Sequence, residues 1–108
     1  ALARAAGIDL EQLADVIAVS SGSSSLFEAR GKKFVLADSY VPGFTTALMR
    51  KDVGLALEMG RQLNVPLPVA AAAYQLYTAA LAAGLAEEDF AAVAKVAAQQ
   101  AGVKLVEK

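Results

Sequence analysis

A lysine and an aspartate stand side by side inside an amphipathic stretch, "FTTALMRKDVGLALEMGRQL", residues 44–63. The pattern predicts a helix from about Phe44 to Leu63, with its apolar side chains in one stripe. Lys51 and Asp52 fall inside this stripe, at about −20° and about 80° from Phe44 on the helical wheel. Residues three and four positions away from either one are uncharged, so no ion pair along the helix is available. Because an unpaired buried ion is costly, a group outside the helix is expected to satisfy the pair.

Two explanations of this pair stay open on the residues alone. In the first, the Lys51 side chain reaches past its neighbours to water, and Asp52 pairs with a basic residue of another helix. In the second, the stripe faces a cleft shared with another domain, where an anionic or polar ligand supplies the missing partner. Phe44 would then form an apolar wall of that cleft. The other charges of the helix, Arg50, Glu58 and Arg61, fall between about 240° and 320° on the wheel, the side that is expected to face solvent.

The composition excludes several kinds of site. The 108 residues contain no cysteine and no histidine, which removes thiolate chemistry, the commonest metal ligand and the commonest general base. A self-contained metalloenzyme or triad hydrolase is therefore not expected, and no metal-binding residue is predicted. The net charge of −1 gives no electrostatic footprint for nucleic acid, so no nucleic-acid partner is predicted.

The elements that must position the charged pair read as helices. Hydrophobic residues make up 56% of the chain and aromatic ones only 6%, so alanine supplies much of the apolar content. This composition and its periodicity predict an all-α fold, a bundle of about five helices in a single domain over residues 1–108. Gly7 ends a first helix, Asp9 with Gln12 forms a capping box for the next one, and residues 20–25 form a serine-rich turn. The helix of residues 44–63 is capped by Thr45 or Thr46 and stopped by Asn64 and Pro66. The next helix runs from Pro68 to Gly84, and the last one opens with Glu87, Glu88 and Asp89 and reaches Gly102.

Two segments fall outside the helices. Residues 31–43 lack helical periodicity and predict an irregular surface connection, with Lys32 and Lys33 as a solvated pair. The tail "VKLVEK", residues 103–108, predicts a frayed end or a strand added to something else.

The chain gives no signal for a membrane. Residues 62–86 are uncharged, but prolines, polar residues and alanine favour a buried helix over a membrane span. The absence of a signal segment and of cysteine predicts a cytoplasmic location. The first residues, "ALARAAG", read as the end of a helix that began upstream, so the chain is expected to be a piece of a longer protein.

Three segments together carry a family resemblance: "AGIDLEQLADVIAVSSGSS", "PGFTTALMRKDVGLALEMGRQLNVPLPV" and "YQLYTAALAAGLAEEDFAAVAKV". In order, they resemble the C-terminal helical domain of β-hydroxyacid dehydrogenases, the 3-hydroxyisobutyrate dehydrogenase and tartronate semialdehyde reductase relatives of 6-phosphogluconate dehydrogenase. The most specific piece is "KDVGLALE", which is similar to the family's Lys-Asp-Leu-Gly-x-Ala-x-Asp/Glu motif, with Val53 in place of leucine.

The resemblance implies a function that this chain shares with missing parts. It implies an oxidoreductase that uses NAD or NADP to move a hydride to or from the β-carbon of a short hydroxyacid, in a cleft between a Rossmann domain and the helical domain. By motif position, Lys51 lies beside the nicotinamide end of the cofactor, Asp52 supports that site, and Phe44 lines the substrate pocket. The implied partners are an N-terminal Rossmann domain of the same chain, the small hydroxyacid and a second copy in a homo-oligomer.

The chain also departs from the family's complete pattern. It contains no Gly-x-Gly-x-x-Gly, so the phosphate-cradling half of cofactor binding is absent. The family's catalytic lysine lies on an interdomain helix before this segment and no residue here matches it, so no catalytic residue is predicted here and the chain alone is expected to be inactive. The alternative is a non-catalytic helical interaction module whose apolar stripe binds a partner helix.

Overall fold

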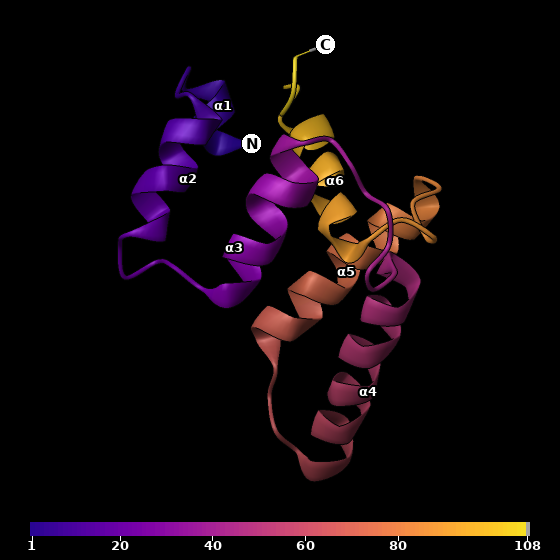
Figure 1. Ribbon diagram of the computed structural model, residues 1–108. Coiled ribbons are helices and arrows are strands. Elements are labelled where there is room, and N and C mark those ends of the chain that lie inside the picture. The colour runs from indigo at the N-terminus through magenta and orange to yellow at the C-terminus, as the bar shows by residue number, and fades with distance from the viewer. Residues whose placement is uncertain (108) are drawn as a thin grey trace. The chain divides into compact units, whose positions relative to one another are not determined.

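The computed structural model describes residues 1–107, and its regular elements are helices joined by turns and loops. In chain order they are α1 (Leu2–Ala5), α2 (Leu10–Ala18), α3 (Ser25–Arg30), the π-helix η1 (Gly31–Leu36), α4 (Thr46–Leu63), α5 (Pro68–Ala82), the 3-10 helix η2 (Phe90–Ala92) and α6 (Val93–Gln100) (Figure 1). Within the described residues, β-structure is limited to an isolated antiparallel bridge between Thr45 and Asp89. The predicted all-α fold is confirmed.

Local capping chemistry sets the ends of most helices. Asp9, Ser24 and Thr45 each accept a hydrogen bond from the backbone N–H three residues later, at 2.9, 3.0 and 3.2 Å. These bonds satisfy N–H groups that the first turn of a helix leaves without a partner. Asn64 ends α4 in the left-handed conformation with φ of 56°, and Pro68 opens α5 at a position where its missing N–H costs nothing. The predicted starts of α2 and α5 and both ends of α4 are confirmed to within two residues.

The prediction of an irregular connection over residues 31–43 is wrong for its first half. η1 follows α3 directly, and the Arg30 guanidinium carbon lies 4.6 Å from the centroid of the Phe34 ring. A π-helix pairs each N–H with the carbonyl five residues back, so its side chains do not follow the 3.6-residue period that signals an α-helix. Lys32 is exposed as expected but forms an ion pair with Asp15 of α2, and this hydrogen bond raises the pKa of Lys32.

The contacts divide the chain into two compact units. Unit 1 comprises Ala1–Val41 and Ala94–Lys108, and unit 2 comprises Pro42–Val93. The single domain over residues 1–108 therefore stays a prediction. In unit 1 the C-terminal tail forms no strand over residues 103–107; instead, the Arg4 Nε donates to the Lys104 carbonyl oxygen at 3.0 Å, and Arg4 pairs with Glu107.

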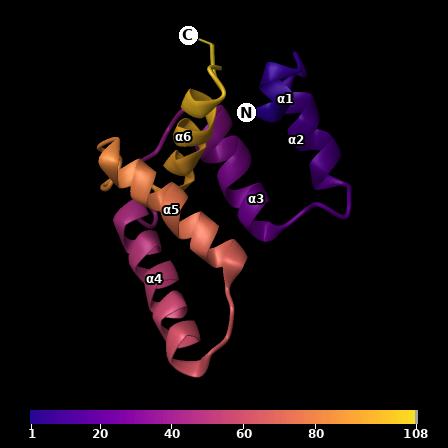
Figure 2. The ribbon, with the colours of Figure 1, turned by 180° about the vertical axis from the view of Figure 1, so that it is seen from behind.

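Unit 2 is built on an antiparallel pair of helices. α4 and α5 lie side by side in both views (Figures 1 and 2). Arg50 Nε of α4 donates to Thr78 Oγ1 of α5 at 3.0 Å. One turn later, Gly54 lies against the Tyr74 ring so closely that a Cβ at Gly54 would lie 3.1 Å from Tyr74 Cε2. Gly54 on α4 thus allows α5 to approach closely.

The uncharged stretch of residues 62–86 contains a turn and a helix rather than one long span. α4 ends at Leu63, α5 runs from Pro68 to Ala82, and Gly84 follows with φ of 83°. None of the helices among residues 1–107 combines the length and the apolar content that a bilayer crossing requires.

The first and last segments of unit 2 are joined by hydrogen bonds. The Thr46 N–H donates to the Glu88 carbonyl oxygen at 2.8 Å, and the Phe90 N–H donates to the Phe44 carbonyl oxygen at 2.9 Å. The Thr46 hydroxyl donates to the carbonyl oxygens of Glu88 and Asp89, at 3.0 and 3.1 Å. Thr46 and Asp89 are 0% exposed, so this junction forms the polar centre of unit 2.

Candidate functional site

The apolar stripe predicted on α4 lies on the exposed side of the helix. Its side chains Leu48, Leu55, Met59 and Leu63 are 42%, 63%, 61% and 65% exposed. Lys51 and Asp52 fall in the same sector of the helix and are also exposed. These six residues are called the α4 face below. A contiguous exposed apolar surface of this kind usually marks an interaction or ligand site.

Lys51 and Asp52 form an ion pair with each other. Lys51 Nζ lies 3.7 Å from Asp52 Oδ1, and the two side chains are 61% and 52% exposed. The sequence analysis expected a group outside the helix to satisfy these charges, whereas here they pair with each other on the surface of α4. An exposed ion pair contributes at most about 1 kcal/mol to stability, so the pair does not hold the fold together. Its ammonium and carboxylate stay available to a ligand.

Arg50 was predicted to face solvent, but it packs against α5 instead. Its guanidinium is hydrogen-bonded to Thr78, and its Cζ lies 4.8 Å from the centroid of the Tyr74 ring. Glu58 and Arg61, by contrast, form an exposed ion pair with Arg61 Nη2 2.6 Å from Glu58 Oε1, which lowers the pKa of the Glu58 carboxyl. α4 is therefore rotated so that a cation packs inward on an aromatic ring and the apolar stripe points outward.

Phe44 lies outside the helix that was predicted to begin with it. It precedes the capping residue Thr45, so its angle on the helical wheel does not apply. The Phe44 ring is half-buried and meets the Phe90 ring edge to face, with centroids 6.3 Å apart and an interplanar angle of 76°. Phe44 thus belongs to an aromatic contact beside the α4 helix start, separate from the Lys51–Asp52 pair.

The sequence reading missed a buried carboxylate next to Phe44. Asp89 Oδ1 accepts hydrogen bonds from the N–H groups of Gly43 and Phe44, at 3.0 and 3.2 Å, and its Oδ2 accepts one from the Ala91 N–H at 3.0 Å. The bond to Ala91 is a local helix cap, which an aspartate before "FAA" could have signalled. The bonds to Gly43 and Phe44 cross the unit, and no local pattern predicts them.

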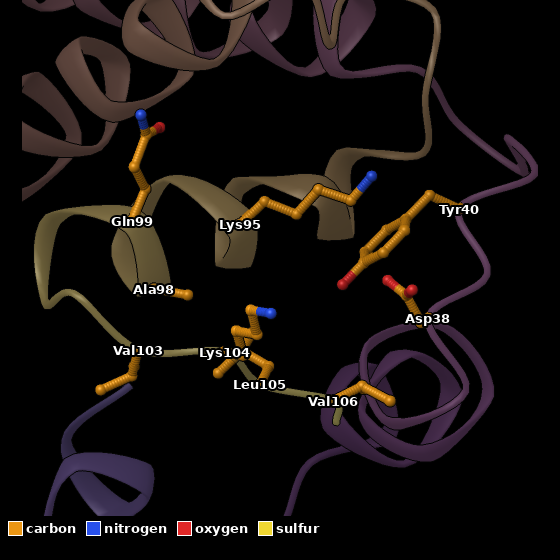
Figure 3. Close-up of a pocket in the computed structure, with 9 residues that line it drawn as sticks. All are labelled: Asp38, Tyr40, Lys95, Ala98, Gln99, Val103, Lys104, Leu105 and Val106. Atoms are coloured by element: carbon orange, nitrogen blue, oxygen red, sulfur yellow. The ribbon is translucent and has the colours of Figure 1, made fainter. Parts of the chain in front are cut away.

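A cavity of about 230 Å³ lies in unit 1 and is lined by residues of that unit alone. Its lining residues, drawn in Figure 3, are Asp38, Tyr40, Lys95, Ala98, Gln99, Val103, Lys104, Leu105 and Val106. Lys95 Nζ lies 4.3 Å from the centroid of the Tyr40 ring, so the lysine packs on an aromatic wall of the cavity. The volume is below the range of about 300–1,000 Å³ typical of ligand pockets. Among residues 1–107, no group of three or more potential metal-ligating carboxylates gathers.

Comparison with known proteins connects the chain to one enzyme family. A family model described as NAD-binding of NADP-dependent 3-hydroxyisobutyrate dehydrogenase matches residues 1–97. The 2-(hydroxymethyl)glutarate dehydrogenase of Eubacterium barkeri is 42% identical over 99 residues, which are 92% of this chain and 33% of that enzyme. The L-threonate dehydrogenase of Haemophilus influenzae is 40% identical over 96 residues, 89% of this chain and 32% of that enzyme.

Solved structures agree with the sequence comparison. A 3-hydroxyisobutyrate dehydrogenase from Salmonella typhimurium superimposes with a TM-score of 0.83 at 37% identity, over 88% of this chain and 33% of that protein. The enzyme of the same name from Mycobacterium tuberculosis, solved with L-serine, gives a TM-score of 0.71 at 32% identity, over 85% of this chain and 33% of that protein. The chain thus spans about one third of the length of the relatives that it matches. The family description names an NAD-binding part of the enzyme and does not mention a C-terminal helical domain.

Proposed function

Since the chain belongs to the family of NAD-binding domains of NADP-dependent 3-hydroxyisobutyrate dehydrogenases, we propose that it is the C-terminal helical domain of an NAD(P)-dependent dehydrogenase of short 3-hydroxyacids. In the complete protein, the nicotinamide exchanges a hydride with the β-carbon of the hydroxyacid. The chain forms one wall of the cleft in which this happens. The observation that carries the proposal is the α4 face, where a cation and a carboxylate stand exposed within an apolar surface.

The helical content supports a place outside the Rossmann half of the enzyme. A Rossmann domain binds the pyrophosphate with a strand, a Gly-x-Gly-x-x-Gly turn and a helix. The sequence lacks this motif, and residues 1–107 form no strand. The family's NAD-binding description is then met by contacts to the nicotinamide side of the cofactor, while a Rossmann domain elsewhere in the same protein holds the phosphates. The relatives are about three times as long as the matched region, which leaves room for that domain.

The proposed roles of individual residues follow from their chemistry. The exposed Lys51 ammonium has donors for the oxygen atoms of the bound cofactor, and Asp52 holds that ammonium in place through the ion pair between them. Phe44 presents the free part of its half-buried ring to the hydroxyacid. The general acid and base comes from the upstream interdomain helix, so this chain alone is inactive. Assembly into a homo-oligomer and a cytoplasmic location belong to the same proposal.

Substitution of Lys51 in the complete protein tests the proposal. Lys51→Met should weaken NAD(P) binding by about tenfold, equivalent to about 1.4 kcal/mol, and should leave the unfolding midpoint unchanged because the Lys51–Asp52 pair is exposed. Isothermal titration of the cofactor and a urea titration measure the two effects. Arg61→Met is the matched control, since it removes an exposed cation from the same helix at a position outside the α4 face. Cofactor affinity that is equal in the wild type and in Lys51→Met would refute the role of Lys51.

A helical interaction module is the second candidate, because the exposed apolar side chains of the α4 face would also suit a partner helix. This function requires neither the cofactor nor the hydroxyacid. A complete wild-type protein that fails to bind NAD(P) would favour it over the dehydrogenase.

A further inference from the structure

The buried Asp89 carboxylate holds the backbone on which Phe44 is mounted. Asp89 is 0% exposed, and its Oδ1 lies within hydrogen-bonding distance of the Gly43 and Phe44 nitrogen atoms, at 3.0 and 3.2 Å. Taking a carboxylate out of water is costly unless hydrogen bonds compensate for the lost hydration. A local helix cap such as the bond to Ala91 forms equally well on the protein surface. Burial of this carboxylate against the Gly43–Phe44 backbone therefore calls for a further role.

We propose that Asp89 is a positioning residue for substrate binding, which fixes Phe44 at the wall of the hydroxyacid pocket. This inference rests on the proposed function, in which Phe44 contacts the hydroxyacid. Asp89 itself contacts no substrate, because it is fully buried. It acts by accepting hydrogen bonds from the backbone N–H groups of Gly43 and Phe44.

Phe44 is held from both its backbone and its ring. Asp89 accepts a hydrogen bond from the Phe44 N–H. The residue after Asp89, Phe90, donates a hydrogen bond from its own N–H to the Phe44 carbonyl oxygen at 2.9 Å. The Phe90 ring also forms the edge-to-face contact that half-buries the Phe44 ring. A change at Asp89 is therefore transmitted directly to the position of the Phe44 ring. Lys51 lies beyond the Thr45 cap, within the regular hydrogen bonding of α4, and is insulated from that change.

Asparagine at position 89 would disturb this arrangement with little change in volume. Each carboxylate oxygen of Asp89 accepts from at least one backbone N–H. An amide has only one acceptor oxygen, so its NH₂ group would face a backbone N–H on one side or the other. The segment carrying Gly43 and Phe44 then loses its acceptor or shifts to find another.

Thr46 provides a matched control in the same junction. Like Asp89 it is 0% exposed, and its hydroxyl joins the same two segments by donating to the carbonyl oxygens of Glu88 and Asp89. Thr46→Val removes these side-chain hydrogen bonds at nearly constant shape. It leaves the acceptor of the Gly43 and Phe44 N–H groups intact. A loss that comes only from weakening the junction would appear in both variants.

Steady-state kinetics of the complete protein test the inference. In Asp89→Asn, the KM for the hydroxyacid should rise by about tenfold or more, since small misplacements of a substrate-positioning group have effects of this size. The Kd for NAD(P) should stay within about twofold of the wild type, because Lys51 is insulated. In Thr46→Val, both values should stay within about twofold although the protein is less stable. An unchanged hydroxyacid KM in Asp89→Asn, or an equal rise in Thr46→Val, would overturn the inference.

A second measurement separates this inference from the proposed function. With 4-fluorophenylalanine at position 44, the fluorine resonance should move in Asp89→Asn and stay in place in Thr46→Val, whether or not the protein turns over a hydroxyacid. An unmoved resonance in Asp89→Asn overturns the positioning role. A wild-type protein that turns over no hydroxyacid with NAD(P) refutes the proposed function instead. If Asp89→Asn does not fold, Asp89→Ser carries the same comparison, since its hydroxyl retains a helix-capping acceptor.

Discussion

At the scale of single residues, Tyr77 ties the stability of unit 2 to alkaline pH. Burial raises the pKa of its phenol, and the negative charge of Asp89 raises it further. An unfolded tyrosine ionises at about pH 10, so above this pH the unfolded state loses a proton that the folded state keeps. The free energy of unfolding should therefore fall as the pH rises above about 10. Tyr77→Phe should remove that part of the fall.

Urea titrations of the wild type and of Tyr77→Phe at about pH 8 and about pH 10.5 measure this difference. The free energy of unfolding should fall more between the two pH values in the wild type than in Tyr77→Phe. This difference should exceed the difference in stability between the two proteins at about pH 8. The same fall in both would show that another group is responsible.

The candidate site could be predicted at some residues and not at others. The position of Lys51 and Asp52 within an apolar stripe follows from spacing, but their ion pair with each other does not, because only partners three and four residues away were considered. The inward position of Arg50 does not follow, since it depends on Thr78 and Tyr74 of another helix. Asp89 was assigned only to a helix start, because its cross-unit partners Gly43 and Phe44 are distant in sequence.

At the scale of the elements, the turn between α4 and α5 depends on a close approach at Gly60. A Cβ at this position would lie 2.7 Å from Leu67 Cδ1 and 2.9 Å from the Val65 carbonyl oxygen. The leucine side chain can rotate, but the carbonyl is backbone and moves only if the turn opens. Gly60→Ala should lower the free energy of unfolding by about 1–2 kcal/mol, even after the gain in helix propensity that alanine brings.

Chemical denaturation measures this loss. Gly22→Ala is the control, because the nearest atom to its added Cβ is Ser20 Oγ at 3.5 Å, an ordinary contact. It should change stability by about 0.5 kcal/mol or less. A Gly60→Ala protein as stable as the wild type would mean that the turn relaxes without cost.

The helix ends were predictable because their causes are local. Asp9, Ser24 and Thr45 cap the residues that follow them directly, and Pro68 opens a helix by its own geometry. The π-helix η1 was missed because its wider turn leaves no 3.6-residue signature. The sequence predicted that the residues of the α4 face share one side of the helix. Whether that side is buried or exposed could not be predicted, because it depends on how α4 packs against another helix.

At the scale of the whole molecule, the exposed apolar side chains predict self-association of the 108-residue chain. Met59→Lys, at a position that is 61% exposed, should weaken this association by at least about tenfold without unfolding the chain. Val19→Lys is the control, because Val19 is 89% exposed, belongs to unit 1 and is not part of the α4 face. Sedimentation velocity over a range of concentrations measures both. A wild-type chain that stays strictly monomeric would contradict the prediction.

The buried Asp89 also constrains when unit 2 can become native during synthesis. The acceptor for the Gly43 and Phe44 N–H groups follows them by 46 and 45 residues. α4 and α5 leave the ribosome before that carboxylate does, so the Gly43–Phe44 segment has no acceptor at that stage. The nascent chain can therefore order Phe44 only after residue 89 has emerged, which makes the aromatic wall a late product of translation.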